Sequence, residues 1–545
     1  MSVSNDAEVP LLSVDRLNLS IHDTVILSDI SFKLHAGQTL GIIGESGSGK
    51  SMTALSIMQL LPRGARLHGN VRFDGHELTT MHEDSLCDLR GGDIGMIFQE
   101  PMTALNPVKT IGEQVCESIR LHRTLARQEA WQLTETTLQR VGLPTVEFPL
   151  NRYPHELSGG QRQRVVIAIA IACKPRLLIA DEPTTALDVT TQAGILDLLR
   201  SLQREEGLAL VFITHDLAVV SSLANHLLVL KDGRIVEQGQ RRDILSKPKE
   251  SYTETLLQAS ALTQYMRKRD TQSGAVHNFS ESKNPLLTAH ELVCEYRVKR
   301  RSWFRPPTYF RAVDQVSFTI NDSECVGLVG ESGCGKSTLT RAILGLMPLR
   351  SGRIELAGEA IDSTEPVSHA QRRLMQVVFQ DPYGSFNPRH KVQRLVAEPL
   401  HVLKTKPSWN EAHELVIQTL LSVGMQASDS DKYIHEFSGG QRQRIAIARA
   451  LIIKPRLIVL DEAVSALDVS VRAQILELLS KLANDQGLAY LFISHDLSVV
   501  QRVTERLLVM KDGKIVEQGP TEKLFSQPSH PYTQQLIRAA PVIKL

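Results

Sequence analysis

The fold of this chain is decided by the stretch Gly44-Glu45-Ser46-Gly47-Ser48-Gly49-Lys50-Ser51, which returns as Gly330-Glu331-Ser332-Gly333-Cys334-Gly335-Lys336-Ser337. Both stretches match the pattern G-x-x-x-x-G-K-[ST], follow an apolar strand-like segment and enter a helical pattern. The glycines let consecutive backbone N–H groups turn toward a phosphate, and the start of the helix adds its dipole. In such a phosphate loop the lysine is expected to hold the β- and γ-phosphates, and the final serine to bind Mg²⁺. The sequence therefore predicts two nucleotide sites.

The phosphate loop belongs to a much larger internal repeat. The segment SGGQRQR occurs at Ser158–Arg164 and at Ser438–Arg444, and KDGRIVEQG at Lys231 returns as KDGKIVEQG at Lys511. Both pairs are 280 residues apart. A polar stretch without apolar periodicity lies between the copies. The repeat predicts two domains, residues 1–261 and 286–545, joined by a linker at residues 262–285.

The composition excludes several classes of protein. The 545 residues include 61 Lys+Arg and 60 Asp+Glu, so the net charge of +1 gives no reason to expect a nucleic-acid partner. No two of the six cysteines form a C-x-x-C pair, so neither a zinc site nor a disulfide framework is expected. The N-terminus does not resemble a signal peptide. The longest apolar run, Val165 to Cys173, is far shorter than the ~18 residues that a membrane-spanning helix needs.

Apolar periodicity in the first copy predicts alternating strands and helices. This order is typical of an α/β fold, in which helices cover both faces of a parallel sheet. The expected strands are Leu11–Leu19, Ser28–Leu34, Thr39–Ile43, Leu177–Ala180 and Ala209–Thr214, and the expected helical segments are Lys50–Leu61 and the region from about Glu113 to Val141.

Two apolar strands end in a pair of acids, Asp181-Glu182 and Asp461-Glu462. The end of a buried strand lies at the carboxyl edge of a parallel sheet, where ligands bind. We expect the aspartate of each pair to hold Mg²⁺, usually through water. The glutamate is placed to polarise a water molecule against the γ-phosphate, so we expect it to be a general base.

Further motifs, in the same order in both copies, resemble those of ABC ATPases. The resemblance implies two P-loop (RecA-like) nucleotide-binding domains, or cassettes, each with an antiparallel β subdomain and a helical subdomain. It implies ATP and Mg²⁺ as ligands and ATP hydrolysis as the activity. The matching elements are the signature segments Ser158-Gly159-Gly160-Gln161 and Ser438-Gly439-Gly440-Gln441, the Q-loop residues Gln99 and Gln380 beside the metal, the D-loops Ala186-Leu187-Asp188 and Ala466-Leu467-Asp468, and the switch residues His215 and His495 at the γ-phosphate.

The signature segments suggest how the two cassettes are paired. Ser-Gly-Gly before a helix forms a second ring of N–H donors, which one segment cannot present to the phosphate already held by its own phosphate loop. The family implies a head-to-tail pair, in which each signature segment closes on the phosphate loop of the other cassette. With both cassettes in one chain the pairing can be intramolecular, and the linker raises their effective concentration.

The ends of the two copies narrow the family. Ser529-His530-Pro531-Tyr532-Thr533 resembles the C-terminal extension of oligopeptide/dipeptide/nickel importer ATPases, and Lys249–Thr253 is a weaker copy. The fused form resembles the double-cassette subunits of peptide (YejF-type, microcin C/peptide) and glutathione importers. This implies an ATPase subunit that energises import of peptides or a related solute. Its partners would be two transmembrane permease subunits and a periplasmic solute-binding protein, with the chain peripheral at the cytoplasmic face of the bacterial inner membrane.

Three other classes of ABC protein remain as alternatives. Tandem ATPases of sugar importers usually have a degenerate second cassette, whereas both motif sets are complete here. Translation-associated tandem ABC proteins have a longer, charged, helical linker. DNA-repair ABC ATPases carry zinc cysteines or a long coiled coil. The binding partner, whether permease, ribosome or DNA, would separate these classes.

Several features set the two copies apart. Ala463-Val464-Ser465 stands where the first copy has Pro183-Thr184-Thr185. The family stacks adenine on an aromatic residue before the phosphate loop, which Tyr309 or Phe310 could supply in the second copy. Between Leu19 and Ile30 the first copy has only the ring of His22. The basic stretch Tyr296–Arg311 is either a solvated loop or a contact for nucleotide or anionic lipid. No cysteine lies between Ser251 and Pro285, so no iron–sulfur centre is expected.

Overall fold

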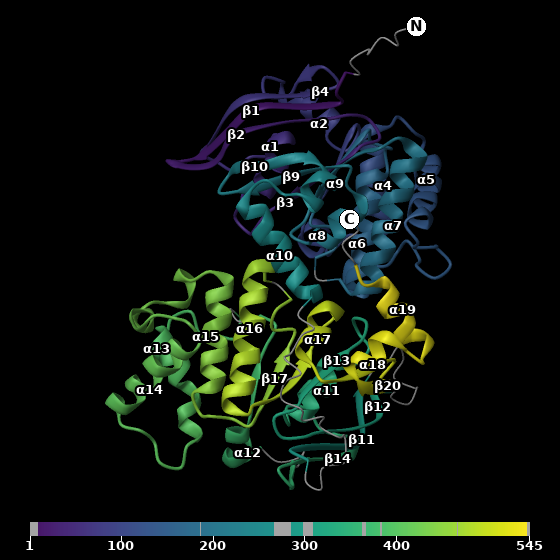
Figure 1. Ribbon diagram of the computed structural model, residues 1–545. Coiled ribbons are helices and arrows are strands. Elements are labelled where there is room, and N and C mark those ends of the chain that lie inside the picture. Colours follow the sequence, from purple (N-terminus) through teal and green to yellow (C-terminus); the bar gives the residue numbers. More distant parts are fainter. Residues whose placement is uncertain are drawn as a thin grey trace.

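The computed structural model describes residues 9–185, 187–265, 285–297, 309–361, 367–381, 384–465 and 467–541. Figure 1 shows two α/β halves, the first in purple to teal and the second in green to yellow. Each half holds a six-stranded sheet and a four-stranded antiparallel sheet. This arrangement confirms the predicted fold class.

The six-stranded sheet of the first half has the order β10-β9-β3-β8-β7-β6. Its strands are parallel except β10, which runs antiparallel to β9. The strands are β3 (Thr39–Ile43), β6 (Ile94–Ile97), β7 (Leu177–Asp181), β8 (Ala209–Ile213), β9 (His226–Lys231) and β10 (Arg234–Gln240). The four-stranded sheet has the order β2-β1-β4-β5, with β1 (Leu12–Ile21), β2 (Thr24–Leu34), β4 (Ala65–Phe73) and β5 (His76–Glu77).

The helices of the first half cover these sheets, and α4 packs against α5 and α6 at one side of this half (Figure 1). The helix α4 begins at a capping box in which Thr110 and Glu113 bond each other's backbone N–H groups. The helices are α1 (Lys50–Ile57), α2 (Glu83–Leu89), α3 (Pro101–Ala104), α4 (Ile111–His122), α5 (Arg127–Arg140), α6 (Gly159–Ile171), α7 (Val189–Glu206), α8 (Leu217–Leu223), α9 (Arg241–Ser246) and α10 (Ser251–Tyr265).

The second half repeats this order. Its six-stranded sheet is β16-β17-β18-β13-β19-β20 and its four-stranded sheet is β12-β11-β14-β15. The strands are β11 (Leu287–Arg297), β12 (Tyr309–Ile320), β13 (Cys325–Val329), β14 (Ser351–Leu356), β15 (Glu359–Ile361), β16 (Met375–Val378), β17 (Leu457–Asp461), β18 (Ala489–Ile493), β19 (Arg506–Lys511) and β20 (Lys514–Pro520). The α-helices are α11 (Lys336–Ile343), α12 (His369–Leu374), α13 (Val392–Ala397), α14 (Trp409–Ser422), α15 (Gly439–Leu451), α16 (Val469–Gln486), α17 (Leu497–Val503), α18 (Thr521–Ser526) and α19 (Pro531–Ala539).

Glycine lets a helix pack close to the strand that leads into each phosphate loop. All five residues of β3 are buried, and a Cβ added to Gly41 would lie 2.3 Å from a methyl carbon of Val220 on α8. In the second half a Cβ on Gly327 of β13 would lie 2.7 Å from Val500 on α17. Because both approaches are shorter than carbon atoms allow, only glycine fits, and the strand that carries the phosphate loop is held against its neighbouring helix.

The predicted helix Lys50–Leu61 is shorter in the structure. The helix α1 ends at Ile57 because Gln59 adopts a left-handed conformation, with φ of 52°. The N–H of Leu60 donates to the carbonyl of Leu55 at 2.9 Å, which closes the helix end.

The predicted linker lies mostly outside the described residues. The helix α10 continues to Tyr265, past the predicted boundary at 261, and β11 begins at Leu287. Most of the predicted basic loop, residues 298–308, also lies outside them. Within the described part of the chain, every helix is too short or too polar to cross a membrane.

Candidate active sites

The phosphate loop of each half connects the buried strand at the centre of the sheet to a helix. Lys50, 5% exposed, folds back and donates from Nζ to the carbonyls of Gly44 at 2.9 Å and Glu45 at 2.8 Å. Lys336 makes the same pair of bonds in the second half, at 2.7 and 2.8 Å. Burial lowers the pKa of Lys50, although acidic neighbours oppose the shift. The lysine is thus held at the inner side of a loop built for an anion.

The first acid of each pair ends its strand beside the phosphate loop. The Ser51 hydroxyl donates to Oδ1 of Asp181 at 3.1 Å, which brings two predicted metal ligands together. Burial, assisted by the charge of Glu182, raises the pKa of Asp181 to about 6. Burial also raises the pKa of Asp461. A divalent cation would relieve this unfavourable burial of negative charge, and hydroxyl and carboxylate oxygens are ligands that Mg²⁺ prefers.

The second acid of each pair has an unusual backbone. Glu182 and Glu462 have φ of 47° and 50°, a left-handed conformation that costs a non-glycine residue free energy. Such strain is typical of functional sites. It directs each carboxylate toward the Q-loop glutamine, with Gln99 Nε2 donating to Glu182 at 3.1 Å and Gln380 Nε2 to Glu462 at 2.9 Å.

Both glutamates also contact their predicted switch histidines. Nδ1 of His215 lies 3.2 Å from Oε1 of Glu182, and Nδ1 of His495 lies 3.4 Å from Oε2 of Glu462. Burial alone would raise the pKa of Glu182, but the contacts with His215 and Thr185 and the charge of Lys50 outweigh it and lower the pKa to about 2. The pKa of Glu462 is also lowered, with His495 and Lys336 overcoming burial.

The sequence difference after the acids changes one hydrogen bond. The Thr185 hydroxyl donates to the carboxylate of Glu182 at 2.9 Å. The Ser465 hydroxyl instead donates to the backbone carbonyl of Glu462 at 2.9 Å. The carboxylate of Glu182 therefore receives a hydroxyl contact that the serine does not give to Glu462.

The signature segments begin the helices α6 and α15, as their composition predicts. The Ser158 hydroxyl accepts from the N–H of Gln161 at 3.3 Å, and Gln161 Oε1 accepts from the N–H of Ser158 at 2.9 Å. Ser438 and Gln441 form the same capping box. Both serines are exposed. In this arrangement the glutamine side chains stabilise the helix start, and the exposed serines and the first glycine of each segment remain accessible.

The two halves meet through the segments that follow their acids. Ser46 in the first phosphate loop donates its N–H to Oδ1 of Asp468 at 2.9 Å, and the backbone of Ser332 in the second phosphate loop bonds Asp188. The Thr190 hydroxyl donates to Glu331 at 2.6 Å, and Ser470 donates to Glu45. Each D-loop aspartate thus reaches the phosphate loop of the other half. The alanines Ala186 and Ala466 of these segments lie outside the described residues.

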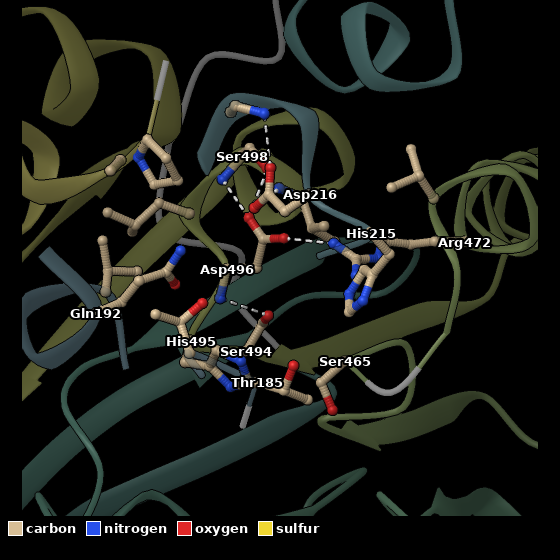
Figure 2. Close-up of a pocket in the computed structure, with 18 of the residues that line it drawn as sticks. Thr185, Gln192, His215, Asp216, Ser465, Arg472, Ser494, His495, Asp496 and Ser498 are labelled. Carbon is tan, nitrogen blue, oxygen red and sulfur yellow. Dashed lines mark hydrogen bonds and ion pairs between the residues drawn. The ribbon is translucent and has the colours of Figure 1, made fainter. Parts of the chain in front are cut away.

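A cavity between the halves brings both switch histidines to one place. It measures about 120 Å³ and is lined by His215 and His495 and by the aspartates that follow them. Figure 2 shows Asp216 and Asp496 side by side, with Arg472 reaching Asp496 from the helix α16. The distance from Arg472 Nη1 to Asp496 Oδ2 is 2.8 Å. The equivalent position in the first half is Gln192, which also lines the cavity.

Sequence comparison decides the family. The pattern described as "ABC transporter" matches residues 27–185 and again residues 313–465. The chain belongs to the ABC transporter family. The two halves are its ATP-binding cassettes, and the chain is an ABC-type ATPase.

The relatives of this ABC chain match it along nearly its whole length. The "Peptidoglycan transport ATP-binding protein YejF" of Agrobacterium fabrum is 45% identical over 538 residues, which is 97% of this chain and 96% of that protein. The "Glutathione import ATP-binding protein GsiA" of Shigella sonnei is 44% identical over 562 residues, covering 98% of this chain and 90% of that protein. A pattern described as "Oligopeptide/dipeptide transporter, C-terminal region" matches residues 236–298 and 516–545. Among solved structures, cbiO1 from Clostridium perfringens, part of the ABC transporter complex cbiONQ, has a TM-score of 0.40 at 26% identity, covering 47% of this chain and 96% of its own.

A third aromatic residue of the second ABC cassette, besides Tyr309 and Phe310, lies close to the phosphate loop. Tyr296 lies on β11, with its hydroxyl 3.2 Å from the Thr338 hydroxyl directly after the phosphate loop. It pairs across the sheet with Phe310, so both rings lie on one face, whereas Tyr309 pairs with Arg297. The first strands of the two copies are 275 residues apart, so Ile21 is the counterpart of Tyr296 in the first copy. Alignment of these two strands in the sequence could have indicated that Tyr296 lies at the end of a strand.

Proposed function

We propose that this ABC chain binds and hydrolyses ATP at two composite sites, and that closure of its cassettes energises import of peptides or a related small solute. The observation that carries the proposal is the exchange of D-loop contacts, in which Asp468 bonds the first phosphate loop and Asp188 the second. This exchange is expected of cassettes already paired within one chain in a head-to-tail sense.

Each composite site would draw on both cassettes. The first joins the first phosphate loop, Gln99, the acids Asp181 and Glu182, and His215 to the second signature segment. The second site joins the corresponding groups to the first signature segment. The exposure of Ser158 and Ser438 leaves these helix starts free to meet a phosphate, where their N–H groups and the helix dipole favour negative charge.

The residues beside each phosphate loop suit Mg²⁺. Ser51, Asp181 and Gln99 would hold the ion at the first site, and Ser337, Asp461 and Gln380 at the second. Mg²⁺ would neutralise charge on the phosphate oxygens. The close approach of Ser51 to Asp181 supports this assignment at the first site.

Glu182 and Glu462 would align the attacking water and accept its proton. In the structure their carboxylates bond the switch histidines and the Q-loop glutamines. His215 and His495 would turn from these carboxylates to the γ-phosphate when ATP is present. That exchange would free the base, because the contact with His215 helps to hold the pKa of Glu182 near 2.

The adenine base would stack at the second site on Tyr296, with Phe310 beside it on the same face of the sheet. Aromatic stacking adds about 1 kcal/mol beyond the burial of surface. The first cassette has Ile21 at the position of Tyr296, so we expect it to bind ATP more weakly in the open state.

The C-terminal extensions and the names of the relatives support import of the peptide type. By this analogy the partners are two permease subunits and a periplasmic solute-binding protein, at the cytoplasmic face of the bacterial inner membrane. The segments 100–107 and 381–388, which follow the Q-loop glutamines, would meet the permeases. In this proposal the domain boundaries stay near residues 261 and 286.

Purification of the tagged chain from native membranes tests the proposal. We expect two integral membrane proteins and a solute-binding protein to copurify, and peptides to stimulate ATP hydrolysis by the complex. Recovery of ribosomes without any membrane protein would favour the translation-associated class instead.

A further inference from the structure

The repeated segment KDG[RK]IVEQG contributes no residue to the ATP sites described above, yet both copies have the same structural role. Each forms a hairpin at the edge of the six-stranded sheet, β9–β10 or β19–β20, onto which the following C-terminal extension docks. Lys231 Nζ lies 4.7 Å from the ring centroid of Tyr252, and Lys511 Nζ lies 4.9 Å from that of Tyr532. These are cation–π distances.

The glutamate of the repeated segment fixes the start of the extension. The carboxylate of Glu517 accepts the backbone N–H groups of Ser529 at 2.8 Å and His530 at 3.1 Å. Glu237 accepts those of Lys249 at 3.0 Å and Glu250 at 3.4 Å. Partial burial would raise the pKa of Glu517, but the nearby Thr533 side chain and the hydrogen bonds from these backbone groups lower it. The carboxylate is therefore charged at neutral pH and can hold the extension in place.

The docked tyrosine reaches the phosphate loop of its own cassette. The Tyr532 hydroxyl accepts the backbone N–H of Glu331 at 3.0 Å, and the Tyr252 hydroxyl accepts that of Glu45 at 3.3 Å. The bond joins residues 201 apart in the second cassette and 207 apart in the first. Both copies of the repeat thus bring a tyrosine to the second residue of the phosphate loop.

The peptide group that the tyrosine holds also binds the phosphate-loop lysine. The N–H of Glu331 and the carbonyl of Gly330 belong to one planar peptide group. Its N–H donates to Tyr532 and its carbonyl accepts from Lys336 Nζ at 2.7 Å. Rotation of this group would break both bonds. The tyrosine therefore fixes the orientation of the carbonyl on which the lysine rests.

The tyrosine hydroxyls are suited to a permanent contact. Tyr532 is 3% exposed, and burial raises the pKa of Tyr252 to about 12 and that of Tyr532 further. Each hydroxyl stays neutral throughout the physiological range. Both hydrogen bonds are partly buried, so water would only partly replace the acceptor that the backbone N–H lost, which makes the contact costly to remove.

We propose that the C-terminal extension of each cassette is a positioning element of its own ATP site, in which Tyr252 and Tyr532 hold the phosphate loop in the conformation that presents its lysine to the phosphates. The inference rests on the proposed role of the phosphate loops in binding ATP. The tyrosines touch neither substrate nor metal and act through the peptide group before Glu45 or Glu331.

The test replaces each tyrosine by phenylalanine, which keeps the ring under the lysine and removes only the hydroxyl. Equilibrium binding of ATP and of ADP is measured on the full chain, with Lys50→Ala present to report on the second site and Lys336→Ala to report on the first. We expect Tyr532→Phe to weaken binding of both nucleotides at the second site about tenfold, the effect of leaving one partly buried N–H without its acceptor. In chains with both lysines, KM should rise while kcat at saturating ATP stays within about twofold, because the contact does not depend on the transition state.

Tyr490→Phe is the matched control. Tyr490 is fully buried in the second cassette, and its hydroxyl donates to the carbonyl of Leu479 at 3.2 Å. The control should lower the midpoint of thermal unfolding as Tyr532→Phe does and leave nucleotide binding unchanged. Glu517→Gln, which loosens the extension, should weaken binding in the same direction as Tyr532→Phe.

Two results separate the possible failures. Unchanged nucleotide affinity in Tyr532→Phe and Tyr252→Phe, with the lysine variants still defective, overturns the positioning role alone. Unchanged ATP binding in a chain with both lysines replaced overturns the proposed function of the phosphate loops.

Discussion

Replacing the glutamate after each metal-site aspartate by glutamine should nearly stop hydrolysis at that site. Glutamine keeps the size of the side chain and can still accept a hydrogen bond from Gln380 or Gln99. It removes the proton acceptor and the carboxylate contact with His495 or His215. Loss of a positioned general base costs roughly 10²–10⁴-fold in rate, or about 3–5 kcal/mol of transition-state stabilisation.

The two glutamates have different contacts, so we expect different losses of rate at the two sites within this range. Contacts with His215 and Thr185 hold the pKa of Glu182 at about 2, and when His215 turns to the γ-phosphate the Thr185 hydroxyl would still make Glu182 a weaker base than an ordinary glutamate. Glu462 does not receive the corresponding hydroxyl, because Ser465 bonds the backbone instead. We expect Glu182→Gln to cost about 10²-fold at the first site, and Glu462→Gln to cost more at the second.

The assay is single-turnover hydrolysis with counting of bound nucleotide. Each variant should bind ATP normally, and the double variant should accumulate a closed state with two ATP molecules. Glu411→Gln is the control, because it makes the same chemical change at a helix start, where glutamine also suits a capping box. If Glu462→Gln hydrolyses ATP at the parent rate, the second site is regulatory, and Ala463-Val464 becomes the first suspect.

Three further predictions concern the interface, the base and the membrane. Burial and the facing carboxylate of Asp496 raise the pKa of Asp216, so its ionised form destabilises the fold above that pKa, and this cost disappears below the pKa of an unfolded aspartate. Asp216→Asn should therefore raise the midpoint of thermal unfolding by about 2 °C at pH 7.5, and this gain should be lost as the pH falls toward 4. An unchanged midpoint at pH 7.5 would contradict the burial argument. Tyr296→Leu should weaken ATP binding at the second site about fivefold, whereas Tyr309→Leu should leave it unchanged, as measured by equilibrium titration; equal effects would mean that the two rings share the base. A cysteine at Met102, which is 58% exposed, should cross-link to a permease in native membranes, and one at Val25, which is 69% exposed on the β subdomain, should not.

The parts of the sites that consist of consecutive residues could be predicted from the sequence. The phosphate loops, the acid pairs and the signature segments owe their conformation to the strand or helix that they begin or end. The place of Tyr296 on a strand was not predicted, because the irregular stretch that begins with it resembles a loop, whereas the strand β11 continues through it to Arg297. The contact of Tyr532 with Glu331 depends on how the extension folds back over some 200 residues, which no local pattern records.

Other details depended on the exact conformation of single groups. Thr185 and Ser465 both carry a hydroxyl three residues after the glutamate, yet one bonds the carboxylate and the other the backbone. Glu182 adopts its left-handed conformation while its N–H donates to the carbonyl of Ile213 on the next strand. Neither the different hydrogen bonds of the two hydroxyls nor the backbone conformation of the glutamate could be predicted from the residue types.

The cavity between the cassettes implies that the two halves of this chain are not interchangeable. Arg472 pairs with Asp496 and also lowers the cost of burying Asp216, whose own cassette offers Gln192 at the equivalent place. Two copies of the first cassette would bury two aspartates against each other without an arginine, and two copies of the second would bring one arginine for each aspartate. A mixed pair shares a single cation between both carboxylates. Electrostatics therefore disfavours a pair of two first cassettes and favours the pairing of the first cassette with the second cassette of the same chain.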